Sequence, residues 1–274
     1  MSQKRTIFFL SDRTGITAET MGHSLLTQFE GIEFRQINIP FIQSGASARR
    51  ARDMINRVAQ EEGVRPILFC TLVDEALTAI IGESEGLILD FFGAFIHSLE
   101  EELGTPSTHT AGRAHGMANV HNYRTRIDAM NFALRTDDGV AEKDYEKADV
   151  ILVGVSRSGK TPTCLYMALQ YGIFAANYPL IQDDLERMAL PDVLQPYRKK
   201  IYGLTIEPVR LAQIRSERRP NSRYSDEANC REEVRIAERL FKLEKIPFLN
   251  TTTRSIEEIA TRIMHETGLM RRFF

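Results

Sequence analysis

The chain has 274 residues, of which 43% are hydrophobic and 26% charged, and its 35 lysines and arginines nearly balance 37 aspartates and glutamates. This composition excludes a disordered chain, the charge balance argues against general nucleic-acid binding, and the apolar runs are too short to span a bilayer. Because no secretory leader precedes the first strand and the three cysteines (Cys70, Cys164 and Cys230) are scattered, we expect a cytoplasmic α/β enzyme without membrane or nucleic-acid partners.

The first half of the chain alternates strands and helices. We predict strands at 6–10, 34–39 and 66–72, and helices at 17–29, 46–62, 75–82 and 87–103. In the first helix, Met21, Leu25 and Phe29 recur at the spacing of one helical face. Alternation of this kind predicts βαβ units and a mostly parallel sheet, which is a Rossmann-like arrangement.

The regular alternation stops at residues 104–122, which are rich in Gly, Thr, His and Asn and are predicted to form a surface loop. A helix at 123–135 and a turn at 136–139 follow. A second series then comprises strands 149–153, 200–205 and 247–249, helices 160–171, 207–216 and 227–244, and a helix that begins with the capping box Ser255–Glu258. We therefore predict an N-terminal α/β domain at 1–145 and a C-terminal P-loop kinase-like α/β domain at 146–274.

The most specific motif opens the second series. Residues 154–161 match G-x-x-x-x-G-K-[ST], a phosphate-binding loop, between an apolar strand and a helix. Its glycines let backbone N–H groups turn toward phosphate oxygens, at the positive end of the following helix. Lys160 would neutralise the terminal phosphates, and the Thr161 hydroxyl would bind Mg²⁺. The predicted nucleotide-binding residues are Gly154, Val155, Ser156, Arg157, Ser158, Gly159, Lys160 and Thr161.

The usual acidic partner of such a loop does not follow the later apolar strands, which end in Thr205 and Asn250. Asp183 and Asp184 are the nearest acids in a suitable position, and either is a candidate base or metal partner. A solvated loop acid or a helix N-cap explains each of them equally well.

Two other segments are candidates for binding anions. The turn at 11–17 follows the first strand, where ligands of open parallel sheets bind, although a turn that ends in a helix cap is the simpler interpretation. Arginine forks suit phosphate and carboxylate, but a solvated helix face explains the second segment equally well. That second segment contains Arg210, Arg215, Arg218, Arg219 and Arg223.

The predicted loop at 104–122 contains histidines at six-residue intervals, which match no common metal-ligand spacing. His115 remains a candidate phosphate contact or proton carrier. The other two members of the series are His109 and His121.

Over nearly its whole length, the chain resembles the bacterial phosphoenolpyruvate synthase regulatory proteins, which are related to the pyruvate, phosphate dikinase regulatory proteins. The segments that carry the likeness are 11–19, 154–163, 175–179, 203–206, 221–224 and 255–260. The resemblance implies a bifunctional enzyme that phosphorylates a threonine of the synthase with ADP, leaving AMP. It also implies removal of that phosphate by inorganic phosphate, which releases pyrophosphate.

Under this resemblance, Lys160 would act on the β-phosphoryl group of ADP, with Mg²⁺ expected. The reverse reaction requires a second anion site, either the turn at 12–17 or the arginines Arg215, Arg218, Arg219 and Arg223. Asp183 and then Asp12 are the candidate catalytic bases. An ATP-dependent phosphotransferase or hydrolase, and a nucleotide sensor that inhibits by contact, are the alternative functions, and the resemblance leaves a homodimer open.

Overall fold

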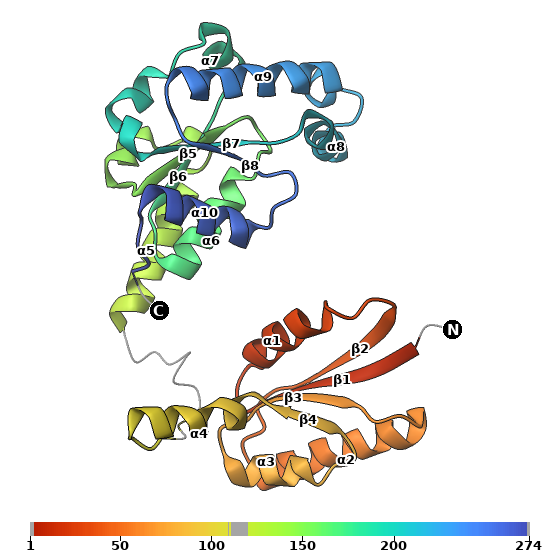
Figure 1. The fold of residues 1–274 in the computed structure, drawn as a ribbon. Coiled ribbons are helices and arrows are strands. Elements are labelled where there is room, and N and C mark those ends of the chain that lie inside the picture. The colour runs from red at the N-terminus through yellow and green to blue at the C-terminus, as the bar shows by residue number, and fades with distance from the viewer. Residues whose placement is uncertain (1–2, 109, 111–119, 273–274) are drawn as a thin grey trace. The chain divides into compact units, whose positions relative to one another are not determined.

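The computed structural model describes residues 3–108, 110 and 120–272, and the chain divides into two compact units, Met1–Ala118 and Asn119–Phe274. Each unit is built on a four-stranded, fully parallel sheet with helices on both faces (Figure 1). The predicted α/β fold class is confirmed. Within the described residues, no helix is long and apolar enough to cross a membrane.

The first unit places its strands in the order β2-β1-β3-β4. The strands are β1 (Gln3–Ser11), β2 (Ile32–Ile39), β3 (Ile67–Thr71) and β4 (Leu87–Asp90). The helices are α1 (Ile16–Leu26), α2 (Gly45–Glu62), α3 (Glu75–Gly82) and α4 (Phe91–Leu103).

Alternate side chains of β1 enter separate cores on the two faces of this sheet. Phe8 and Leu10 pack with Ile55 of α2, whereas Ile7 and Phe9 pack with the α1 side of the unit. Strands of this kind are continuously apolar because helices cover both faces of a parallel sheet. The arrangement leaves the carboxyl ends of the strands, and the loops that follow them, as the edge available for binding.

The predicted helix at 87–103 is wrong in its first turn. Leu87–Asp90 form β4, which pairs in parallel with β3, and Leu87 is the register partner of Ile67. The helix begins only at Phe91, because the Asp90 carboxylate accepts hydrogen bonds from the N–H groups of Phe92 and Gly93. Four apolar residues are too few for periodicity to separate strand from helix.

The second unit repeats the strand order as β6-β5-β7-β8. Its strands are β5 (Val150–Gly154), β6 (Ala175–Pro179), β7 (Ile201–Thr205) and β8 (Phe248–Asn250). Its α-helices are α5 (Val120–Arg135), α6 (Lys160–Tyr171), α7 (Gln182–Arg187), α8 (Pro208–Arg218), α9 (Glu227–Leu243) and α10 (Ile256–Thr267). Its described residues also form four short 3₁₀ helices: η2 (Asp137–Gly139), η3 (Glu142–Lys147), η4 (Asp192–Lys200) and η5 (Arg223–Ser225).

The strand β5 is buried along its whole length between two helical layers. Ile151 and Val153 pack toward α8 and α9, whereas Leu152 packs toward α6 and α10. This central, rigid strand ends where the predicted phosphate loop begins.

Two features of this unit differ from the sequence-based elements. The strand β6 was not predicted, because Ala-Ala-Asn has little intrinsic strand preference, and its pairing with β5 fixes it. The helix α5 begins at Val120 and packs on α6. Residues 119–145, which were predicted to end the first domain, therefore lie within the second compact unit. The predicted loop histidines His109 and His115 lie outside the described residues, as does the side chain of His121.

Candidate functional site

The predicted phosphate loop connects β5 to α6 at the carboxyl edge of the second sheet. A Cβ at Gly154 would lie 2.2 Å from the carbonyl oxygen of Leu204 on β7, so only glycine fits at the point where the loop leaves the strand. Gly159 caps α6 with a φ of +90°, a conformation that glycine adopts without strain. The required glycines therefore have distinct causes, a close strand approach and a left-handed cap.

The Lys160 ammonium is buried and folds back on its own loop. Its Nζ donates hydrogen bonds to the carbonyl oxygens of Gly154 and Val155, each at 2.9 Å. Burial lowers the pKa of Lys160 to about 8, and the carboxylates of Asp138 and Asp137 oppose this only in part. The ammonium is thus poorly solvated and rests on two neutral acceptors.

The Thr161 hydroxyl faces an acidic residue that lies 24 positions earlier in the chain. Thr161 Oγ1 donates to Asp137 Oδ1 at 2.8 Å, and Asn177 Nδ2 donates to the same oxygen. Asp137 belongs to η2, in the turn predicted at 136–139. The structure therefore brings together a hydroxyl and a carboxylate, which are ligand types that Mg²⁺ prefers.

The Asp137 carboxylate is held by Asn177 of the edge strand β6. Asn177 is fully buried, and its Oδ1 accepts a hydrogen bond from the Asp138 N–H at 3.1 Å. Asp138 has a φ of +51°, an uncommon value for a residue other than glycine. The buried Asn177 amide thus holds both the Asp137 carboxylate and the backbone of the turn that carries it.

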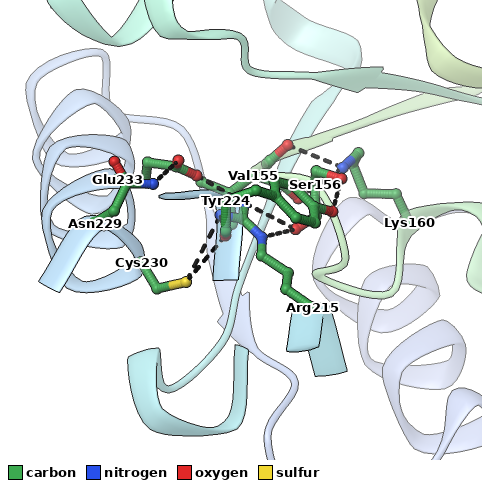
Figure 2. A network of polar contacts seen from close by, with 9 residues as sticks. Val155, Ser156, Lys160, Arg215, Tyr224, Asn229, Cys230 and Glu233 are labelled. Carbon is green, nitrogen blue, oxygen red and sulfur yellow. Dashed lines mark hydrogen bonds and ion pairs between the residues drawn. The ribbon is translucent and has the colours of Figure 1, made fainter. Parts of the chain in front are cut away.

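Behind the loop, Arg215 of α8 is buried with a full set of partners (Figure 2). Its Nη2 lies 2.7 Å from Glu233 Oε2 of α9 and 3.2 Å from the Ser156 carbonyl oxygen, and its Nη1 donates to the Tyr224 carbonyl at 3.1 Å. The guanidinium carbon lies 4.3 Å from the centre of the Tyr224 ring. Arg215 therefore binds a loop carbonyl, and its guanidinium has little capacity left for a substrate anion.

Two hydroxyl groups complete the attachment of the loop. Ser156 Oγ and the Tyr224 hydroxyl lie 2.9 Å apart, and the Thr251 hydroxyl lies 3.2 Å from the Ser158 carbonyl oxygen. In contrast, the Ser158 hydroxyl is buried and has no hydrogen-bond partner among the described residues. Hydrogen bonds to Tyr224, Thr251 and Arg215 thus hold the loop in place, while the buried Ser158 hydroxyl remains unpaired in the described residues.

The candidate acids of α7, Asp183 and Asp184, form no hydrogen bond or ion pair with Lys160 in the described part of the chain. Asp184 is buried, and its Oδ2 accepts hydrogen bonds from the Tyr178 hydroxyl and the Ile181 N–H, as expected of a group that caps α7. Asp183 is exposed on α7 and forms no hydrogen bond or ion pair with another described residue. Asp12 belongs to the first unit, at the end of β1.

The arginine segment divides into buried and exposed members. Arg215 belongs to the network described above, whereas Arg218, Arg219 and Arg223 are exposed. These last three have no ion-pair partner within residues 3–108, 110 and 120–272. Arg210 lies apart and donates to Gln213 at 3.3 Å. The described residues contain no group of three or more His, Cys, Asp or Glu side chains placed to hold a metal ion.

Sequence reasoning missed three residues beside the loop: Asp137 and Asn177, which contact Thr161, and Asp138, whose charge acts on Lys160. The only signal was the pair of adjacent acids in the turn predicted at 136–139. The acidic partner was expected after one of the later strands, but the carboxylate beside Thr161 comes from the turn before β5.

Comparison with known proteins identifies the family of the chain. A family model described as Kinase/pyrophosphorylase matches residues 7–264. The chain belongs to the Kinase/pyrophosphorylase family. Relatives from Marinobacter nauticus, Hahella chejuensis and Pseudomonas aeruginosa are 51%, 53% and 52% identical to it. The alignments cover 98%, 98% and 100% of this chain and 99%, 98% and 100% of the relatives.

All three relatives are provisionally named as phosphoenolpyruvate synthase regulatory proteins. The resemblance inferred from the sequence is therefore confirmed at the level of the family. In this Kinase/pyrophosphorylase family member, the phosphate loop and the groups around Thr161 form the candidate active site of the second unit.

Proposed function

We propose that this family member transfers a phosphoryl group reversibly to a threonine of phosphoenolpyruvate synthase in the cytoplasm. In one direction, the threonine oxygen attacks the β-phosphorus of ADP, the bond to the bridging oxygen breaks, and AMP leaves while the threonine proton passes to a base. In the other, inorganic phosphate attacks the phosphothreonine, which regenerates the hydroxyl and releases pyrophosphate. The family description and the relatives' names support this proposal.

The observation that carries the proposal is the arrangement of Lys160 and Thr161 at the end of a buried strand. Lys160 rests on two neutral carbonyl oxygens at 2.9 Å, so an anionic phosphate oxygen would be a stronger acceptor and would draw the ammonium toward it. The loop N–H groups would hold the α- and β-phosphates at the N-terminus of α6. Positioning and charge neutralisation of this kind supply most of the catalysis in phosphoryl transfer.

The groups beside the loop fit a magnesium ion. The Thr161 hydroxyl and the Asp137 carboxylate are oxygen ligands already within 2.8 Å of each other, and Asn177 holds the carboxylate in place. Bound Mg²⁺ would neutralise charge on the phosphate oxygens. Asp137 would thus serve as the acidic partner of the phosphate loop, in place of an acid after the strands that end in Thr205 and Asn250.

For the reverse direction, the exposed arginines Arg218, Arg219 and Arg223 remain the proposed site for the second anion, together with the turn at 12–17 as the alternative. Charge reversal at Arg218 or Arg223 should depress pyrophosphate release. If release were unchanged, the arginines would be excluded as the phosphate site. Asp183 and Asp12 remain proposals for the proton acceptor, and a homodimer remains a proposal.

The direct experiment incubates the purified protein with phosphoenolpyruvate synthase and ADP, and then with phosphate, while AMP and pyrophosphate are measured. Mass spectrometry of the synthase should detect one phosphothreonine that phosphate removes. Labelling with ATP but not ADP would favour another phosphotransferase. Inhibition of the synthase without phosphothreonine would favour a nucleotide sensor. The Lys160→Ala variant should lose ADP-dependent labelling, and a normal rate in this variant would reject the assignment of the loop.

A further inference from the structure

Arg157, in the middle of the phosphate loop, holds an unfavourable backbone conformation. Its φ is +73°, in the left-handed region that glycine adopts freely and other residues adopt only at a cost. A left-handed residue helps to turn consecutive N–H groups toward one side, which is an arrangement that binds anions. The side chain of Arg157 is exposed and forms no hydrogen bond or ion pair with another described residue. The contacts that hold this conformation must therefore act on its neighbours.

Ser156, the residue before Arg157, is held at two points by a distant part of the chain (Figure 2). Nε and Nη2 of Arg215 lie 3.4 and 3.2 Å from the Ser156 carbonyl oxygen. That carbonyl belongs to the peptide bond between Ser156 and Arg157, so its position fixes one end of the left-handed residue. Ser156 Oγ lies 2.9 Å from the hydroxyl of Tyr224. Two attachments fix the orientation of a residue that a single one would leave free to rotate.

Tyr224 is itself fixed in place. The guanidinium carbon of Arg215 lies 4.3 Å from the centre of its ring, and its carbonyl oxygen accepts a hydrogen bond from Arg215 Nη1 at 3.1 Å. The turn that carries it is closed by Ser222 and Ser225, whose hydroxyls donate to the Arg219 carbonyl at 2.8 and 3.0 Å. Because the ring and the turn are both held, the Tyr224 hydroxyl is presented to the phosphate loop in one orientation.

The Tyr224 hydroxyl can be separated from the rest of this network. Within the described residues its hydrogen-bond partner is Ser156, whereas the contacts with Arg215 involve the ring and the carbonyl oxygen. Removing the hydroxyl alone would leave the ion pair between Arg215 and Glu233 intact. The effect of this hydroxyl therefore falls on the phosphate loop.

We propose that Tyr224 is a positioning residue for phosphoryl transfer, whose hydroxyl orients Ser156 and keeps the Arg157 backbone in its phosphate-binding conformation before a nucleotide binds. The inference rests on the proposed function, because it takes the loop to bind the two phosphates of ADP. A loop that already has its binding conformation loses less free energy when its ligand is bound. Tyr224 therefore acts on the affinity for the phosphates, and neither on the nucleoside nor on the chemical step.

The test compares ADP with pyrophosphate, which carries two phosphates without a nucleoside. In Tyr224→Phe the contacts of the ring and the carbonyl with Arg215 remain, and only the hydroxyl is lost. Loss of one neutral hydrogen bond should weaken both ligands by the same factor, about three- to tenfold, in calorimetric titration. Binding that remains in Lys160→Ala is subtracted as binding outside the loop. At saturating ADP the rate of synthase labelling should be unchanged, while the KM for ADP rises by the same factor.

A matched control and a double-mutant cycle complete the experiment. Tyr197→Phe is the same change at a hydroxyl without a hydrogen-bond partner among the described residues, so it should leave both Kd values unchanged. If the Tyr224 hydroxyl acts through Ser156, then Tyr224→Phe in a Ser156→Ala background should change either Kd by no more than about twofold.

Several results would overturn the positioning role. They are unchanged affinities in Tyr224→Phe, with or without a lower unfolding midpoint, a loss for ADP without a loss for pyrophosphate, a lower labelling rate at saturating ADP, and a full loss again in the Ser156→Ala background. Failure of the proposed function itself has a different signature, because Lys160→Ala would then bind ADP and pyrophosphate as tightly as the unmodified chain does.

Discussion

Replacing Arg215 tests whether the buried network behind the phosphate loop stabilises the second unit. The side chain of Arg215 is 1% exposed and that of its partner Glu233 is 25% exposed. Arg215→Met keeps the apolar stem of the side chain, but it removes the guanidinium and with it the ion pair and the hydrogen bonds to the carbonyl oxygens of Ser156 and Tyr224.

The expected loss in the free energy of unfolding follows from these contacts. Breaking a buried ion pair by removing one partner costs about 3–5 kcal/mol, because the other charge remains unpaired. Since Glu233 is partly exposed and can regain water, we expect the lower end, about 3 kcal/mol. The double variant Arg215→Met, Glu233→Leu leaves no unpaired charge and should recover part of this loss. Arg218→Met, on the exposed side of the same helix, should change stability by less than about 0.5 kcal/mol.

The assay is urea denaturation followed by circular dichroism, because the chain has no tryptophan. Since two compact units need not unfold together, hydrogen exchange of the β5 amides should localise the loss to the second unit. A stability of Arg215→Met within 0.5 kcal/mol of the unmodified chain would refute the reasoning. An equal loss in Arg218→Met would refute it as well.

Three further changes probe the second unit. Gly154→Ala places a Cβ 2.2 Å from the carbonyl oxygen of Leu204, so it should lower stability by about 3 kcal/mol or more, whereas Gly82→Ala has open space and serves as the control in thermal denaturation. The pKa of Lys160 is lowered from 10.5 to about 8 in the folded chain. Between these pH values the unfolded chain binds more protons than the folded chain, so the contribution of Lys160 to the free energy of unfolding increases as the pH rises. Subtracting the pH profile of Lys160→Met from that of the unmodified chain should isolate this rise, and a flat difference would contradict the burial argument. Asp137→Asn should weaken Mg²⁺-dependent nucleotide affinity about tenfold or more in calorimetric titration, with little change in metal-free affinity; equal losses in both would contradict a metal role.

Local patterns predicted the parts of the molecule that local forces determine. The phosphate loop was found because its glycines, lysine and threonine stand at a fixed spacing between an apolar strand and a helix. The short strands β4 and β6 were missed because their neighbours in the sheet, and not their own composition, make them strands.

Contacts between distant residues account for the rest. Asp137 reaches Thr161 across 24 positions of sequence, through a turn conformation that no periodicity encodes. Arg215 and Arg218 are both arginines of one helix, and sequence spacing alone did not reveal that the first is buried against Ser156 while the second faces solvent. The assignment of a charged group to substrate or to structure therefore required the fold.

The central claim, reversible phosphoryl transfer at the phosphate loop, is tested most directly by following a label in both directions. ADP labelled at the β-phosphorus is incubated with phosphoenolpyruvate synthase and this protein, and unlabelled phosphate is then added. The account predicts label on a synthase threonine with one AMP formed for each, and then labelled pyrophosphate, with both steps lost in Lys160→Ala. Label that never reaches the synthase, or transfer that persists at the normal rate in Lys160→Ala, would contradict it.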